Sequence, residues 1–212
     1  MQSGCRFSGR GSEHSRITAT RGIESAGVEP RQGTLASPRT TRTLSLCGKP
    51  GGPCLTPDIT YVAAGEGWLY LAAVMDLASR RIVGWSMSER LKAELVCDAL
   101  KSAYWKRKAA PGLIMYTDRG SQYAGDRYRA SIKDFRMIQS MSRRENCWNN
   151  APVESLFKTL KVERIPQIRS ETRAQVRLDI VNWIEGFYDL ERMHSSINDP
   201  TPAAAESSLI AA

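Results

Sequence analysis

The pattern of apolar and polar positions divides the chain near residue 55. Upstream, no spacing of apolar residues typical of a helix or strand persists for more than a few positions. Downstream, short apolar runs alternate with polar turns and predict three strands, at 59–62, 68–77 and 81–87. Because the intervening turns are only a few residues long, we expect these strands to form an antiparallel meander.

Further along the chain, helical patterns alternate with two more short strands. Apolar residues recur three and four positions apart, which is typical of helices with one buried face. The predicted elements are a helix at 92–108, a strand at 113–116, a helix at 122–135, a strand at 137–140, helices at 152–164 and 171–192, and a short helix opened by Thr201 and Pro202. On the longest helix, the expected buried positions are Val176, Ile180, Ile184 and Phe187.

This order of elements predicts an α/β fold with a mixed five-stranded sheet and flanking helices. A leading meander followed by alternating helices and strands resembles the ribonuclease H-like fold. We therefore expect a folded core at 55–202, preceded by a segment at 1–54 and followed by a C-terminal tail at 203–212.

The segment at 1–54 has a composition unlike that of the core. It holds 9 of the 16 glycines and 4 of the 10 prolines, and Phe7 is its single aromatic residue. Such a segment buries too little apolar surface to offset the entropy of ordering, so we expect disorder. Two interpretations remain: a basic arm that binds DNA, or an out-of-frame translation ahead of a genuine domain.

The chain carries a formal net charge of +8, with a pI of about 9.4, which suits a polyanionic partner such as nucleic acid. Residues 1–54 account for +5 of this charge and the rest of the chain for only +3. DNA affinity in the core is therefore expected from local patches. The alternative interpretation is an ordinary solvated basic surface.

Cysteine usage and apolar runs bear on the cellular location. The five cysteines include no CxxC pair and no zinc-finger spacing, so we expect free thiols in a reducing compartment. The longest apolar run, 69–75, is too short to span a bilayer, and the N-terminus lacks the apolar core of a signal peptide. The sequence thus predicts a cytoplasmic protein without a membrane partner.

Three carboxylates are the candidates for chemistry. Asp58 begins the first predicted strand, Asp118 follows the strand at 113–116, and Glu154 lies in the first turn of a helix, with 35 residues between it and Asp118. Carboxylates that converge in this way can hold two divalent cations beside a phosphodiester. Each also has a structural alternative, as a turn residue or as a helix N-terminal charge. Asp76 is a competing candidate, for which a salt bridge or turn is the alternative.

Basic residues surround these carboxylates in the sequence. Lys158 and Lys161 share a helix face with Glu154, whereas Leu156 and Leu160 lie on the opposite face. An exposed pair between Glu154 and Lys158 is the alternative interpretation. Basic side chains contact phosphates, and an aromatic ring can stack on an unpaired base. Further candidates for DNA contact are Arg119 and Gln122, beside Asp118, and Arg143 and Arg144 in a polar loop at 142–150. Trp148 lies in the same loop.

Several motifs occur in an order that resembles the catalytic subunit of bacterial insertion-sequence transposases of the IS-three family, which shares the integrase core of retroviruses. They are Asp58-Ile59-Thr60-Tyr61, Thr117-Asp118-Arg119-Gly120-Ser121-Gln122-Tyr123, Ala151-Pro152-Val153-Glu154 and Arg192-Met193-His194-Ser195. The chain departs from the family pattern at Leu55, Tyr116, Glu145 and Asn149, and in its first 54 residues.

The resemblance implies a catalytic Asp-Asp-Glu triad of Asp58, Asp118 and Glu154, with two Mg²⁺ (or Mn²⁺) ions as cofactors. It implies contact of Lys161 with DNA ends, and as partners the element ends, target DNA, further copies of the chain and a protein from an upstream frame. Two rival functions remain: a silent remnant that binds DNA or transposase subunits without catalysis, and a ribonuclease H-type nuclease that cleaves hybrids.

Overall fold

The computed structural model describes residues 54–107, 110–142, 150–165 and 172–211, and the structural statements below concern these ranges. The segment expected at 1–54 therefore lies outside the described residues, except for Cys54. None of the helices in the described ranges is long and apolar enough to cross a membrane.

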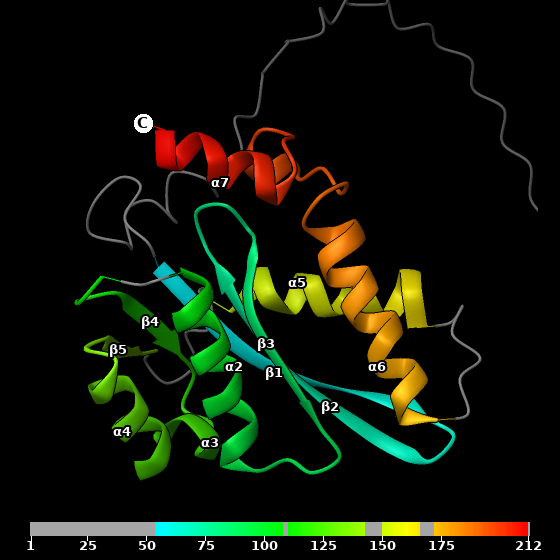
Figure 1. The fold of residues 1–212 in the computed structure, drawn as a ribbon, viewed down its shortest axis with the longest axis horizontal. Coiled ribbons are helices and arrows are strands. Elements are labelled where there is room, and N and C mark those ends of the chain that lie inside the picture. Colours follow the sequence, from blue (N-terminus) through cyan, green and yellow to red (C-terminus); the bar gives the residue numbers. More distant parts are fainter. Residues whose placement is uncertain (1–53, 108–109, 143–149, 166–171, 212) are drawn as a thin grey trace, which may run out of the picture. The chain divides into compact units, whose positions relative to one another are not determined.

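A mixed five-stranded sheet forms the centre of the fold, as the order of predicted elements indicated (Figure 1). The strands are β1 (Cys54–Ala64), β2 (Gly67–Asp76), β3 (Ile82–Ser88), β4 (Ile114–Thr117) and β5 (Ile138–Met141). Their order across the sheet is β3-β2-β1-β4-β5. The first three strands pair antiparallel, whereas β4 runs parallel to both β1 and β5. The predicted meander is thus confirmed.

Helices cover both faces of this sheet (Figure 1). They are α2 (Ala93–Arg107), α3 (Ser121–Ala124), α4 (Asp126–Asp134), α5 (Ala151–Thr159), the π-helical segment η1 (Leu160–Arg164), α6 (Arg173–Asn182), the π-helical segment η3 (Trp183–Tyr188), the short 3₁₀ turn η4 (Ser195–Ile197) and α7 (Pro202–Ala211). One core packs α2, α3 and α4 against the sheet, and a second packs α5, η1, α6 and η3 against the other face. Residues expected as a C-terminal tail belong to α7 as far as Ala211.

The structure corrects three of the predicted boundaries. The first strand begins at Cys54, so Asp58 lies within it and does not begin it. The helix expected at 122–135 is interrupted at Gly125, whose extended backbone separates α3 from α4. The helix expected to reach residue 192 is α-helical only as far as Asn182 and continues as the π-helical η3 to Tyr188.

The π-helical segment also changes which side chains are buried. Val176, Ile180 and Ile184 lie in the core as predicted, but Phe187 is 38% exposed. A π-helical segment has more residues in each turn than the regular spacing assumes, so it rotates the later positions around the axis. Trp183 and Tyr188 are buried in this segment.

The expectation of free cysteines holds for one of the two described cysteines. Cys97 is a buried free thiol on α2. Cys54 is disulfide-bonded, which differs from the prediction, and its partner lies outside the described residues. Sequence spacing alone missed this bond because a disulfide depends on the approach of two residues in space.

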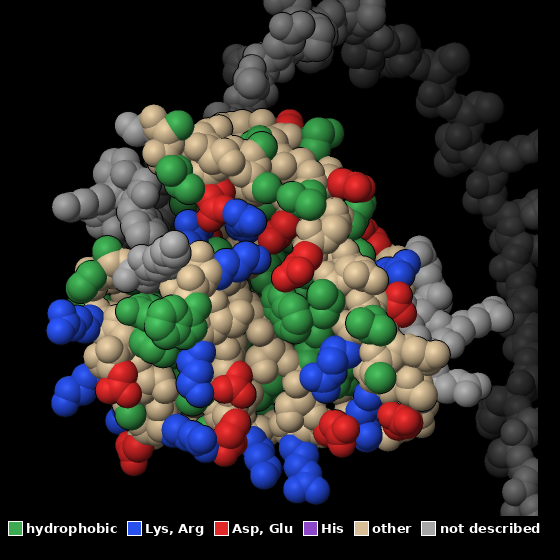
Figure 2. Space-filling view, in the orientation of Figure 1, with side chains coloured by type: hydrophobic (Ala, Val, Ile, Leu, Met, Phe, Trp, Pro, Cys, Tyr) green, Lys and Arg blue, Asp and Glu red, His purple; other side chains and the backbone are tan. Residues whose placement is uncertain are grey.

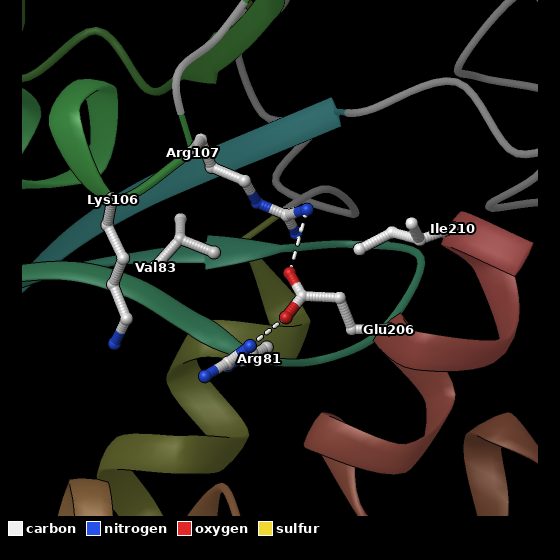
Figure 3. A pocket seen from close by; sticks show the side chains of 6 residues that line it. All are labelled: Arg81, Val83, Lys106, Arg107, Glu206 and Ile210. Carbon is white, nitrogen blue, oxygen red and sulfur yellow. Dashed lines mark hydrogen bonds and ion pairs between the residues drawn. The ribbon is translucent and has the colours of Figure 1, made fainter.

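An ion-pair network fastens α7 to the end of the sheet where β3 begins. Arg81 and Arg107 approach the Glu206 carboxylate from two sides, and a cavity of about 320 Å³ opens beside them (Figure 3). Arg107 also pairs with Asp76, and Arg81 with Asp189. Since Glu206, Asp76 and Asp189 are all buried, these acids are neutralised by the arginines and hold the C-terminal helix in place.

Candidate active site

Strand pairing directs Asp58 and Asp118 to the same end of the β1–β4 ladder. The parallel pairs Cys54–Ile114 and Leu55–Met115 each join residues sixty positions apart, as Asp58 and Asp118 also are. The ladder ends after Leu55, and Asp118 follows the last residue of β4. Both carboxylates therefore lie beyond the paired segment, at the carboxyl end of β4. In open α/β sheets this is where ligands bind.

The pKa of the Asp58 carboxyl group responds to the charges of both other candidate carboxylates. Burial is the main cause that raises the pKa of Asp58 to about 6; the Ile59 backbone N–H opposes this rise, and the negative charges of Asp118 and Glu154 contribute to it. That N–H donates to Asp58 Oδ1 at 2.7 Å. Charges act in this way only over short distances. The structure thus brings Asp118 and Glu154 close enough to Asp58 to repel its charge.

The position of Glu154 depends on a buried hydrogen bond between β1 and the start of α5. Thr56 Oγ1 donates to Asn150 Oδ1 at 3.1 Å, and both residues are buried. The Glu154 backbone N–H donates to the Asn150 carbonyl at 2.9 Å, in the first turn of the helix. Asn150 therefore connects Glu154 to the strand that carries Asp58, two residues beyond Thr56.

Residues after β4 surround Asp118. Its Oδ1 accepts a hydrogen bond from the Gly120 backbone N–H at 2.8 Å. A Cβ at Gly120 would lie 3.0 Å from Asp118 Oδ1 and 3.4 Å from Gln122 Oε1, so Gln122 lies beside the carboxylate. Buried Tyr123 completes this group: burial raises its pKa well above the usual value, and the charges of Tyr128, Asp58 and Asp118 add to the effect.

The structure describes three of the other residues predicted to contact DNA, namely Arg119, Lys158 and Lys161. Arg119 is exposed and donates from Nε to the Ser142 carbonyl at 3.1 Å. Lys158 and Lys161 are exposed on the α5–η1 helix, while Leu156 and Leu160 are buried on its other side, as the amphipathic pattern predicted. The candidates Arg143 and Arg144, and the loop residue Trp148, lie outside the described residues.

Asp76 is engaged elsewhere and does not compete for the site. It is 3% exposed, pairs with Arg107, and accepts the Ala78 backbone N–H at 2.8 Å. In the sheet it lies opposite Leu55, three residues before Asp58. Asp76 therefore has the salt-bridge and turn role that the sequence offered as its alternative.

A divalent cation would find suitable donor chemistry in the three carboxylates. Hard oxygen ligands are those that Mg²⁺ and Mn²⁺ prefer. In the described ranges, however, no three His, Cys, Asp or Glu side chains stand close enough together to form a ready-made ion site. The donor types fit a metal, and the mutual repulsion at Asp58 is the interaction that a bound cation would relieve.

Thr56 and Asn150 are the neighbours of the carboxylates that sequence reasoning did not single out. Thr56 lies two residues before Asp58, and therefore on the same face of β1, so strand alternation was one available signal. Asn150 is four residues before Glu154, but its side chain makes no helix-capping bond. Its partner is 94 residues away, and sequence spacing does not indicate such a pairing.

Comparison with known protein families places this site in a recognised domain. Two family models, both described as "Integrase core domain", match residues 52–147 and 136–202. Together they cover the sheet, α5 and α6. All three candidate carboxylates lie within the matched ranges.

Curated relatives are similar over the same part of the chain. The transposase InsF for insertion sequence IS3A of Escherichia coli K12 is 45% identical over 154 residues, which are 73% of this chain and 54% of the relative. The transposase for insertion sequence element IS904 of Lactococcus lactis is 45% identical over 145 residues, or 68% of this chain and 57% of that protein. The chain thus spans about half the length of the curated relatives it matches.

A solved structure has the same fold. A chain of the simian T-cell lymphotropic virus intasome, solved in complex with PP2A regulatory subunit B56 gamma, matches with a TM-score of 0.54 and 13% identity. The match covers 72% of this chain and 53% of that one. The mixed sheet with its flanking helices is therefore ribonuclease H-like, as predicted. With two integrase core matches and close insertion-sequence relatives, the chain belongs to the IS3 family of transposases.

Proposed function

We propose that this chain catalyses metal-dependent DNA cleavage and strand transfer during transposition, with residues 55–202 as its catalytic core. The observation that supports this most directly is the repulsion that Asp118 and Glu154 exert on the Asp58 carboxyl group. Asp58 lies within β1, Asp118 directly follows β4 and Glu154 lies on α5, and the charges of Asp118 and Glu154 both act on Asp58. This arrangement suits phosphoryl transfer, in which catalysis consists largely of positioning and charge stabilisation.

Asp58, Asp118 and Glu154 would hold two Mg²⁺ or Mn²⁺ ions in this proposal. When bound, such ions activate the attacking oxygen and stabilise the leaving oxygen of a phosphodiester. Asn150 keeps Glu154 against β1, and the backbone N–H groups of Ile59 and Gly120 orient the two aspartates. The protein contributes alignment, and no covalent protein–DNA intermediate is needed.

The exposed basic side chains would position the DNA backbone. Lys158 and Lys161 lie one and two helical turns beyond Glu154, and Arg119 follows Asp118 directly. Figure 2 shows basic, acidic and hydrophobic side chains interspersed on one face of the molecule. This pattern agrees with affinity that comes from local contacts near the carboxylates. We include Gln122, Arg143 and Arg144 in the proposed DNA-binding set.

The same proposal includes the substrates, the partners and the cellular location of the protein. Element ends and target DNA are the substrates, several copies of the chain assemble on them, and an upstream-frame protein is a further partner. The protein acts in the bacterial cytoplasm, where such DNA is found.

Substitution Glu154→Gln tests the catalytic assignment. It removes one charge without changing the size of the side chain, so Mg²⁺-dependent cleavage of an oligonucleotide carrying the element end should fall by at least about a hundredfold. DNA binding and the urea unfolding midpoint should stay unchanged. Glu191→Gln, at another exposed helix-end glutamate, is the matched control and should cleave like the original chain.

Unchanged cleavage by the Glu154→Gln variant would contradict the assignment. Binding without cleavage by the original chain would favour the silent remnant, which binds DNA or transposase subunits without catalysis. Preference for an RNA–DNA hybrid over duplex DNA in direct competition would favour the ribonuclease H-type nuclease.

A further inference from the structure

Two exposed aromatic rings project from the β1–β2 hairpin close to the proposed active site. Tyr61 is 53% and Trp68 52% exposed, although most other large apolar side chains of the two strands are buried. Their rings meet edge to face, with centroids 5.0 Å apart and planes at 86°. The Lys161 Nζ lies 4.6 Å from the centre of the Tyr61 ring. We call Tyr61, Trp68 and Lys161 the hairpin platform.

The hairpin platform lies a short, defined distance from the carboxylates. Tyr61 is three residues beyond Asp58 on β1, which corresponds to roughly 10 Å along the strand and places its side chain on the opposite face. Lys161 is seven residues beyond Glu154 on the α5–η1 helix, which is also roughly 10 Å. Because Lys161 contacts Tyr61, both elements leave the site in the same direction. The edge of β1 is not paired with β4 beyond Leu55, and at this edge Lys161 reaches the Tyr61 ring from the helix. A nucleic acid strand that follows this edge reaches the platform within about three nucleotide steps of the carboxylates.

The hairpin is held rigidly by α6. The Arg173 side chain donates to the Glu66 carbonyl at 2.6 Å and to the Trp68 carbonyl at 3.3 Å. The Arg173 backbone N–H donates to the Glu66 carboxylate at 3.0 Å. These bonds fix the backbone that carries Trp68, so its ring is presented to solvent at little further entropic cost on binding.

We propose that the hairpin platform binds an unpaired nucleobase within about three nucleotides of the scissile phosphate. This inference rests on the proposed function, since it assumes that DNA reaches the carboxylates. Exposed aromatic rings stack on bases of any sequence, and the neighbouring lysine meets the phosphate charge. The occupant is thus a frayed or single-stranded nucleotide of the DNA substrate, held by a base stack and one ionic contact.

Binding of the full chain to tailed DNA tests this inference. The probe is a duplex with a mixed-sequence single-stranded tail, compared with the same duplex carrying an abasic tail of equal length and charge. Substitution Trp68→Ala should weaken binding to the tailed duplex roughly five- to 100-fold. On the abasic tail, the variant and the original chain should bind within about twofold of each other. Trp68→Phe, which keeps an aromatic ring, should retain most of the affinity.

Trp105→Ala is the matched control, because Trp105 is 71% exposed on α2 and is not part of the platform. It should leave binding to both DNAs unchanged. The inference is overturned if Trp68→Ala binds the tailed duplex as tightly as the original chain does. It is also overturned if the substitution weakens binding to the abasic-tailed duplex by as much as binding to the tailed duplex. An original chain that binds no tailed DNA overturns it as well.

Cleavage by Mg²⁺-loaded protein is measured separately on the same DNA, so the two proposals fail in different ways. A chain that shows the Trp68-dependent preference for bases but does not cleave would contradict the proposed function alone. If the original chain cleaves DNA and Trp68→Ala does not change binding to the tailed duplex, only the proposed role of the hairpin platform is contradicted.

Discussion

Asn150 illustrates how a single polar side chain positions the proposed active site. Its side chain bonds to Thr56 on β1, and its carbonyl accepts the backbone N–H of Glu154. Buried hydroxyl and amide groups are costly without partners, so this pair specifies how the helix meets the strand. The sequence presented Asn150 only as the end of a polar loop.

Asn150→Ala should destabilise the fold by about 1–3 kcal/mol, because it leaves the Thr56 hydroxyl buried without its partner. Cleavage should fall more than DNA binding, since Glu154 loses its attachment to β1. Urea unfolding and cleavage assays measure these effects. The double variant with Thr56→Val should cost less than the sum of the two single changes. Strict additivity would show that the hydrogen bond has no such role.

His194, which packs against Tyr188 of η3, makes the stability of the fold depend on pH. Its ring meets that of Tyr188 edge to face, and its Nε2 atom is buried without a hydrogen-bond partner in the described residues. Burial, together with the charges of Arg192 and Arg80, lowers the pKa of His194 to about 4. The folded protein therefore holds a neutral imidazole over a range where the unfolded chain binds a proton.

The original chain should consequently lose stability relative to His194→Phe as pH falls from about 6.5 to 4. The folded pKa lies below the unfolded one, so protonation favours the unfolded chain in this window. Urea midpoints of both proteins across the window measure the difference. Asp189, whose pKa burial raises to about 6, has the opposite trend but is present in both proteins and cancels. A constant difference between the two proteins would contradict the prediction.

The close approach of α2 to β3 is the tightest contact between a helix and the sheet at a glycine. A Cβ at Gly84 would lie 2.5 Å from both the Ala103 nitrogen and the Ala99 carbonyl oxygen. Only the absence of a side chain permits this packing, which brings α2 onto the sheet and buries Leu100 beside it. The strand pattern predicted β3, but periodicity gave no sign of this close approach.

Gly84→Ala should destabilise the protein by about 3 kcal/mol or more, because the obstructing atoms are helix backbone and cannot rotate away. Thermal or urea unfolding measures the change. Gly186→Ala is the control, since a Cβ there meets nothing within 4 Å. In the helical geometry of η3 this control should be neutral or stabilise by up to about 1 kcal/mol. Similar stability of the Gly84 variant and the original chain would contradict the packing argument.

At the level of the whole molecule, α7 is joined to the rest of the fold mainly through charge. Glu206 is its buried acid, and it meets Arg81 and Arg107 from the start of β3 and the end of α2 (Figure 3). Apolar packing is limited, because Leu209 and Ile210 on the same helix are exposed. The attachment of α7 therefore depends on this network.

Glu206→Ala should release α7 while the sheet stays folded. Removing one member of a buried ion pair leaves the partner charges uncompensated, at a cost of about 3–5 kcal/mol for fully buried pairs and less here, where Arg81 is 30% exposed. Amide hydrogen exchange should accelerate at residues 203–211 of α7 and not in β1. Ser207→Ala, at an exposed neighbour, should leave exchange unchanged. Protection of α7 in the Glu206 variant would show that apolar contacts suffice.

The sequence by itself determined the order of strands and helices, the antiparallel meander and the amphipathic helix with Glu154 and the lysines outward. These follow from the spacing of apolar residues, which is a local property of the chain. The resemblance to transposases came from local motifs as well, and the family comparisons confirm it. The choice of Asp58, Asp118 and Glu154 as ligands stays a prediction.

Only the tertiary structure decided which distant residues meet. It placed Asp58 and Asp118 beyond the same end of the β1–β4 ladder, joined Thr56 to Asn150 and paired Asp76 with Arg107. It also moved Phe187 to the surface and brought Lys161 onto Tyr61. Periodicity specifies which side of an element is apolar, whereas strand register, π-helical rotation and ion pairing depend on how elements pack. For this reason the sequence named the candidate carboxylates, and the fold supplied the neighbours that position them.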